Sequence, residues 1–104
     1  NMSDINYQTM AGAIATSTHG TGRQLGSMSS YVTGLRLVTP AGEVIDCSAD
    51  KETDLFNAAR TSLGALGVIT RLRFQNRKKH RLHQQEWQGC HGQYGDGMKP
   101  LLAQ

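Results

Sequence analysis

The sequence has few cysteines, few aromatic residues and no long apolar run. Its 104 residues include two cysteines, Cys47 and Cys90, so a framework of several disulfides is excluded. No C-x-x-C or H-x-x-x-H spacing occurs, which argues against a metal site. No apolar stretch is long enough to span a bilayer. Cys47 follows an expected strand and is predicted to be a small buried residue.

Positive charge accumulates late in the chain, whose formal net charge is +3. The basic side chains there are Arg71, Arg73, Arg77, Lys78, Lys79 and Arg81, with His80 and His83 among them. Phe74 is the only ring inside this cluster, whereas single-stranded nucleic acid usually stacks on several. The favoured interpretation is a strand whose polar face and exit turn are solvated. The alternatives are attraction to an anionic cofactor or partner, and binding of nucleic acid.

The first part of the chain predicts a helix, a loop and a hairpin. Residues 9–15 are small and apolar and suit a short helix or turn, and residues 16–26 are rich in Thr, Gly and Ser and suit a loop. Residues 31–39 alternate as a strand, residues 40–42 form a turn, and residues 43–47 return as a second strand.

A second helix and a third strand follow. Leu55, Phe56, Ala59 and Leu63 have helical spacing, with Ser48 or Asp50 as the expected N-cap. Residues 67–75 alternate again, and this pattern predicts one inward and one outward face. The inward set is Val68, Thr70, Leu72 and Phe74, and the arginines face out.

The expected fold is α+β, with a mostly antiparallel sheet flanked by one or two helices. Residues 83–87 suit one more strand, and residues 98–103 suit the start of a helix. We expect one partial domain over residues 1–87, followed by a glycine-rich linker at residues 88–104. No secretory leader is visible, so the expected location is cytoplasmic.

Two glycine-rich segments, residues 12–22 and 64–70, are the candidate binding motifs. Small residues let a ligand approach the backbone and its N–H groups. The first segment adds the hydroxyls of Thr16, Ser17, Thr18 and Thr21. It contains no lysine, so it is not a P-loop. No acidic residue follows about 20 residues on at the end of a second parallel strand, as a dinucleotide fingerprint requires. A plain Gly/Thr-rich surface loop is the structural alternative.

The amino-acid sequence of these segments resembles that of one flavoprotein family. The residues that carry the likeness read TMAGAIATSTHGTG, then VTGLRLVTPAGEVI, then DLFNAARTSLGALGVITRL. Residues 9–72 are similar to the second subdomain of the PCMH-type, vanillyl-alcohol-oxidase-type FAD-binding domain. Within that superfamily, the likeness is to the aldonolactone oxidases and alditol oxidases.

The resemblance implies FAD as cofactor and a set of contact residues. Thr9 would approach the flavin edge, Gly12 and Ala13 would lie against the cofactor, and the loop after them would follow the ring and pyrophosphate. Gly67 and its neighbours would meet the adenine end with their backbone. The implied set is Thr9, Gly12, Ala13, Ser17, Thr18, His19, Gly20, Gly22, Gly67, Val68 and Ile69. No catalytic residue is implied, because the family supplies those side chains from a cap domain.

His19 is expected to be a hydrogen-bonded structural residue, with a flavin contact or general-base catalysis as alternatives. The flavin-bearing histidine of covalent family members lies in an earlier loop. By the resemblance the substrate is a sugar alcohol or aldonolactone, and the isolated chain is expected to be inactive. The rival functions are a self-associating module that pairs through an exposed sheet edge, and a basic nucleic-acid-binding domain.

Overall fold

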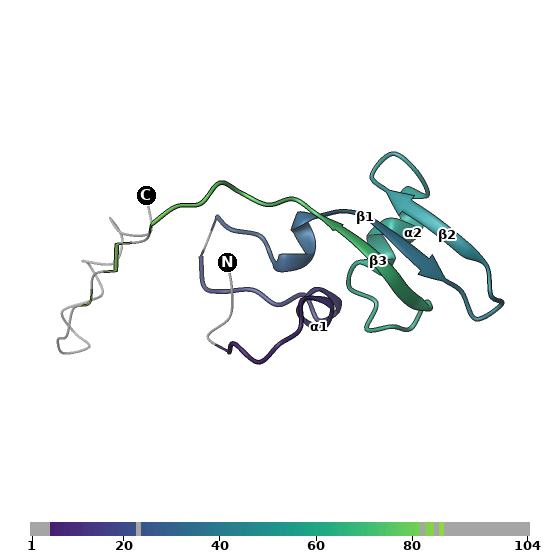
Figure 1. The fold of residues 1–104 in the computed structure, drawn as a ribbon, viewed down its shortest axis with the longest axis horizontal. Coiled ribbons are helices and arrows are strands. Elements are labelled where there is room, and N and C mark those ends of the chain that lie inside the picture. The colour runs from purple at the N-terminus through teal and green to yellow at the C-terminus, as the bar shows by residue number, and fades with distance from the viewer. Residues whose placement is uncertain (1–4, 23, 82, 85, 87–104) are drawn as a thin grey trace.

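A computed structural model describes residues 5–22, 24–81, 83–84 and 86 (Figure 1). In chain order the elements are α1 (Met10–Ala15), the 3₁₀ helix η1 (Met28–Tyr31), β1 (Val32–Val38), β2 (Val44–Ser48), α2 (Thr53–Ala59) and β3 (Val68–Phe74). The strands form one antiparallel sheet in the order β2-β1-β3. The predicted α+β fold with an antiparallel sheet is therefore confirmed.

Two bulges set which side chains of the β1–β3 ladder face the core. The pairing skips Thr33 in β1, between the pairs Val32–Phe74 and Gly34–Arg73, and skips Thr70 in β3. Each extra residue reverses the alternation along its own strand.

The second bulge makes part of the predicted inward face of residues 67–75 wrong. Leu72 and Phe74 are partly buried as expected, but Val68 is 66% exposed and Thr70 is exposed. Ile69 packs against the core in their place, opposite Leu37. The alternation of apolar and polar residues in the sequence does not reveal a bulge, because the position of the extra residue, Thr70, depends on how β3 pairs with β1.

The core lies on one face of the sheet. Leu35 and Leu37 of β1 and Cys47 of β2 meet Phe56 of α2 in it, and Leu37 is fully buried. The full cluster is Ala13, Ile14, Met28, Val32, Leu35, Leu37, Cys47, Phe56 and Ala59. Since α1, η1 and α2 all contribute to this cluster, they lie on the same face. Cys47 is buried as predicted.

The start of α2 differs from the expected cap. Glu52 holds the N-cap position in a left-handed conformation, with φ 52°, and makes no side-chain cap bond. Ser48 instead closes a turn, since its N–H donates to Lys51 O and its Oγ accepts from the N–H of Asp50. The predicted cap at Ser48 or Asp50 is wrong because α2 begins later, with Glu52 at the N-cap position, and the Ser48 hydroxyl is used within the turn.

The end of α2 also comes earlier than the spacing suggested. The helix stops at Ala59, so Leu63 lies beyond it with φ 53° and is 74% exposed. The residues of the pattern that lie within the helix, Phe56 and Ala59, are buried, and Leu55 is partly buried. Leu63 was therefore wrongly assigned to the buried face.

The described residues beyond β3 form no further helix or strand. His83, Gln84 and Glu86 belong to no strand, and the rest of the strand expected at residues 83–87 is not described. The linker at residues 88–104 and the helix start at residues 98–103 lie outside the described residues. In the part of the chain that is described, no helix has the length and apolar character needed to cross a membrane.

Candidate functional site: a glycine-rich loop and a strand edge

Thr9 organises the first predicted motif as the N-cap of α1. Its Oγ1 accepts from the N–H of Gly12 at 3.1 Å, and its carbonyl accepts from the N–H of Ala13 at 2.9 Å. A Cβ added at Gly12 would lie 3.2 Å from that same Oγ1. Glycine at this position keeps the cap uncrowded and leaves the outer surface of the first turn without a side chain.

A chain of hydroxyls ties the loop after α1 back to the helix. Thr16 Oγ1 donates to Gly12 O at 2.9 Å. Thr16 Oγ1 also lies 3.2 Å from Thr18 Oγ1, whose single proton is shared between two acceptors in reach, Thr16 Oγ1 and Gln8 Oε1 at 3.5 Å. Gln8 Nε2 donates to Thr18 Oγ1 at 3.2 Å. The hydroxyls of Thr16 and Thr18 therefore hold the loop in shape.

The backbone at the end of α1 turns sharply. Ser17 adopts the left-handed conformation, with φ 56°. The N–H groups of Ser17 and Thr18 donate to Ile14 O and Ala13 O at 3.0 and 2.8 Å. These bonds satisfy the carbonyls at the helix end and direct the following residues outward.

The outermost part of the loop carries His19, Gly20 and Gly22. His19 is exposed, and its Nδ1 lies 2.8 Å from Gly20 O. With the proton on Nδ1, this contact is a hydrogen bond and Nε2 is left as an acceptor. Gly22 is exposed and Gly20 is half-buried. This stretch presents its backbone beside one hydrogen-bonding ring.

Ser29 anchors the far side of the loop, and sequence reasoning missed it. Its buried Oγ donates to Ile14 O at 2.6 Å, and the neighbouring Met28 N–H donates to Thr18 O at 2.8 Å. Ser29 is the one buried polar residue among those described. Nothing in the local sequence distinguishes it from Ser27 or Ser30, because its role depends on η1 reaching α1.

The second predicted motif belongs to the sheet. Gly67 has φ 140°, and a Cβ there would lie 2.3 Å from Val38 O. Glycine is therefore required by the approach of the chain to β1, independently of any ligand. Val68 and Ile69 open β3, which pairs with β1 on one side only and is an edge strand.

The predicted site residues thus fall into two groups that are held by different secondary-structure elements. Thr9 through Gly22 are held by α1 and η1, whereas Gly67, Val68 and Ile69 are held by β1. Ala13 is 3% exposed, so its side chain belongs to the core. The assignment of these residues to cofactor contacts stays a prediction.

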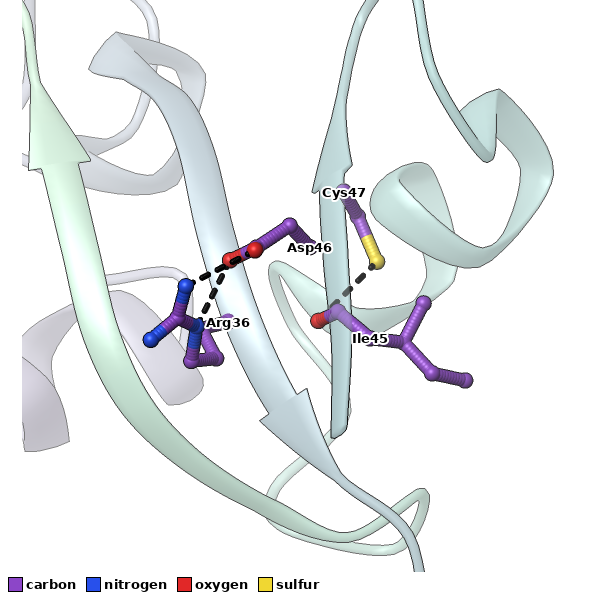
Figure 2. A network of polar contacts seen from close by, with 4 residues as sticks. All are labelled: Arg36, Ile45, Asp46 and Cys47. Carbon is purple, nitrogen blue, oxygen red and sulfur yellow. Dashed lines mark hydrogen bonds and ion pairs between the residues drawn. The ribbon is translucent and has the colours of Figure 1, made fainter. Parts of the chain in front are cut away.

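An ion pair on the other face of the sheet was also missed. Figure 2 shows Arg36 and Asp46 on one side of β1 and β2, while Cys47 points the other way, toward α2. The Arg36 guanidinium holds the pKa of Asp46 below its ordinary value by hydrogen bonding, and burial raises the pKa of Cys47. This pair could have been found from the predicted hairpin, because a turn at residues 40–42 places Arg36 opposite Asp46.

Metal chemistry finds no support in the described residues, where no group of three or more His, Cys, Asp or Glu side chains converges. The polar groups at the glycine-rich loop are instead backbone amides, hydroxyls and one imidazole. Such groups bind neutral or anionic organic ligands.

Comparison with known families agrees with this chemistry. A family model described as FAD binding domain matches residues 1–48. This segment includes α1, the glycine-rich loop and the β1–β2 hairpin, and it ends where β2 ends. The second motif, at residues 64–70, lies outside the match.

Several curated proteins are similar over a longer stretch. A putative D-arabinono-1,4-lactone oxidase of Neurospora crassa is 45% identical over 74 residues, which are 71% of this chain and 13% of that protein. An L-gulono-1,4-lactone dehydrogenase of Mycobacterium tuberculosis is 44% identical over 86 residues, 83% of this chain and 19% of that protein.

A plant lactone dehydrogenase is also similar to this chain. The mitochondrial L-galactono-1,4-lactone dehydrogenase 1 of Oryza sativa is 39% identical over 82 residues, 79% of this chain and 14% of that protein. The chain therefore spans less than a fifth of the length of the curated relatives it matches.

Proposed function

Because this chain carries part of an FAD-binding domain of the aldonolactone oxidase and dehydrogenase family, we propose that its glycine-rich loop and the start of β3 form the surface that contacts FAD. The contact residues of the proposal are Thr9, Gly12, Ser17, Thr18, His19, Gly20, Gly22, Gly67, Val68 and Ile69, with Ala13 supporting them from the core.

The observation that carries this proposal is the backbone exposed by a small-residue loop on a hydrogen-bonded base. The Thr9 cap fixes this base on one side, and Met28 and Ser29 fix it on the other through their bonds to Thr18 O and Ile14 O. Gly12 and Gly22 are exposed and carry no side chain that would keep a flat ring away. A preorganised backbone surface of this kind suits a flat flavin ring, because binding then orders little new structure.

The free edge of β3 supports the adenine end of the proposal. An edge strand has N–H and C=O groups that no neighbouring strand uses. In the proposal, the outward-pointing backbone groups at the start of β3, where Val68 and Ile69 lie, bind the adenine edge.

For the whole protein we propose oxidation of a carbon–hydroxyl group of a sugar lactone. The three relatives are all named for 1,4-lactones, which favours a lactone over the alditol alternative. Bound FAD supplies the two-electron oxidation chemistry, and this chain's residues bind and orient it.

Self-association is a second candidate, carried by the exposed sheet edges. Among the described residues, β2 and β3 each pair with β1 alone, and Val44 on β2 is 61% exposed. Sedimentation of the purified chain over a concentration series tests it. A monomer at all concentrations contradicts this candidate.

The test of the cofactor surface is a titration of the purified chain with FAD, followed by flavin fluorescence. We expect saturable binding that Gly20→Val weakens by about tenfold or more, because the added branches obstruct the loop surface. Gly34→Ala, on the opposite face of the sheet, is the matched glycine control and should bind like the parent. No saturation at millimolar FAD, or equal binding by Gly20→Val, would contradict the proposal.

A further inference from the structure

The face of the sheet opposite to α1 and α2 contains a shallow hollow of about 280 Å³. Leu35 and Leu37 point into the core, so Arg36 between them points to this other face. We call the feature the outer hollow and define it by Gly34, Arg36, Asp46, Lys51, Arg71 and Arg73. Side chains from β1, β2, β3 and the turn before α2 thus meet there.

The outer hollow is strongly positive. Its charged lining consists of four cations and one carboxylate, an excess of three positive charges. Asp46 is held by Arg36 through two hydrogen bonds of 2.8 Å. Lys51 and Arg71 also favour the charged form of Asp46 and lower its pKa. One carboxylate therefore compensates only part of the positive charge that converges on it.

Gly34 forms the floor of the outer hollow, and the fold does not require glycine there. It lies in the central strand, opposite Ser48 on β2 and Arg73 on β3. A Cβ at Gly34 would lie 3.4 Å from Cys47 O and 3.8 Å from Arg73 Cβ, which leaves room for a methyl group. The positive-φ glycines are Gly42, Gly64 and Gly67, so Gly34 needs no special backbone conformation.

Glycine within a strand usually weakens it and often marks a place where another molecule comes close. At Gly34 the missing side chain deepens the outer hollow between Arg73, Arg71 and Lys51. Arg71 and Arg73 are alternate residues of β3, exposed on the same side, so both guanidinium groups can reach across this floor. Guanidinium forks match phosphate oxygens in shape and charge.

We propose that the outer hollow is an anion site that binds a ligand with a terminal phosphate group, which FAD lacks, and that it is separate from the FAD surface. The site lies on the face of the sheet opposite to the glycine-rich loop. Arg73 and Arg71 hold the phosphate oxygens, Lys51 adds charge, and Gly34 lets the group approach the strand. Inorganic pyrophosphate and the phosphates of a nucleotide share this chemistry.

The test is a titration of the purified chain with inorganic pyrophosphate by isothermal calorimetry at moderate salt. We expect saturable binding that Arg73→Gln weakens by about tenfold, since charge-assisted hydrogen bonds are lost. Gly34→Val should weaken binding similarly by filling the floor without changing charge. Lys78→Gln, which removes one exposed cation outside the hollow, should leave binding unchanged.

ADP in place of pyrophosphate separates the two sources of the phosphate. Equal affinity means that the site recognises the phosphates alone, and tighter ADP binding means that the nucleoside also contacts the face. Either result supports the anion site. No saturation by millimolar pyrophosphate, or equal weakening by Lys78→Gln and Arg73→Gln, overturns it.

FAD titrations keep this proposal distinct from the proposed function. Arg73→Gln should leave FAD affinity unchanged, and Gly20→Val should weaken FAD while leaving pyrophosphate affinity unchanged. A parallel loss of both ligands in Arg73→Gln would assign the arginine to the FAD site and overturn the separate anion site.

Discussion

Arg36 and Asp46 face each other across β1 and β2 and are joined by two hydrogen bonds of 2.8 Å, from Nε and Nη2 to the two carboxylate oxygens. The side chains are 33% and 52% exposed, so water screens the pair. The pair matters more for positioning than for stability, because the two hydrogen bonds from the Arg36 guanidinium fix the Asp46 carboxylate in the outer hollow. The neighbouring cations are left available for another anion.

The first prediction concerns the pH dependence of this pair. The pKa of Asp46 is lowered in the folded chain, first by its hydrogen bond to Arg36. Its stabilising contribution is therefore present above the unfolded value of about 3.9 and is lost as pH falls through the lower folded pKa. Asp46→Asn should lower the urea midpoint slightly at neutral pH and leave it unchanged in strong acid.

Urea unfolding of both chains at several pH values measures this difference. Asp50→Asn, on the neighbouring turn, is the control for loss of an exposed carboxylate. A deficit of Asp46→Asn that is constant down to strong acid would contradict the assignment.

The second prediction concerns Gly67. Gly67→Ala should destabilise the chain more than Gly42→Ala does. Both substitutions place a side chain at positive φ, which costs about 1–2 kcal/mol. Only at Gly67 does the added Cβ also meet backbone, 2.3 Å from Val38 O, whereas the space at Gly42 is open.

Thermal unfolding of the two variants beside the parent measures this difference. Equal losses would mean that the chain does not approach β1 as closely as the structure has it.

The third prediction compares two leucines that the sequence pattern does not separate. Leu37→Ala should cost about 2–5 kcal/mol, since Leu37 is 0% exposed and its removal leaves a cavity in the core. Leu63→Ala should have little effect, because that side chain is 74% exposed and lies beyond α2.

Chemical denaturation measures both free energies of unfolding. A large loss in Leu63→Ala would restore the longer helix that the spacing suggested.

The fourth prediction tests the cap of α1. Thr9→Ala should cost about 0.5–2 kcal/mol, because the N–H of Gly12 loses its acceptor. Thr9→Ser retains the hydroxyl and should preserve most of the stability.

Hydrogen exchange of the Gly12 amide gives a local measurement beside global unfolding. If the amide exchanges equally fast in Thr9→Ala and Thr9→Ser, the cap contributes nothing.

Much of the architecture could be predicted from residues 31–47 and 67–75. The turn at residues 40–42 lies between two segments with strand propensity, so the hairpin and even its Arg36–Asp46 register follow from local pattern. The inward face of β3 did not follow, because the bulge at Thr70 exists only in the pairing with β1. The end of α2 was likewise invisible in a spacing that continued to Leu63.

The candidate site divides in the same way. The glycines and small residues of residues 12–22 and their likeness to an FAD-binding domain were readable in the sequence, and the family match over residues 1–48 agrees with them. The structure gives Gly67 a different reason to be glycine, since any side chain there would collide with the carbonyl of Val38, with or without a ligand. The supporting contacts of Gln8 and Ser29 join residues 10 and 15 positions apart, which no local pattern encodes.

The sequence by itself determined the antiparallel α+β fold, the exposed arginines of β3, the buried Cys47 and the flavin-binding family. Each of these depends on local sequence, that is, on secondary-structure propensity, on the alternation of apolar and polar residues, and on the residues of the motifs. Tertiary structure alone decided the two bulges, the early end of α2 and the gathering of Arg36, Lys51, Arg71 and Arg73 around Gly34. Those features arise where distant segments pair, and pairing is settled by packing and hydrogen bonding across the whole sheet.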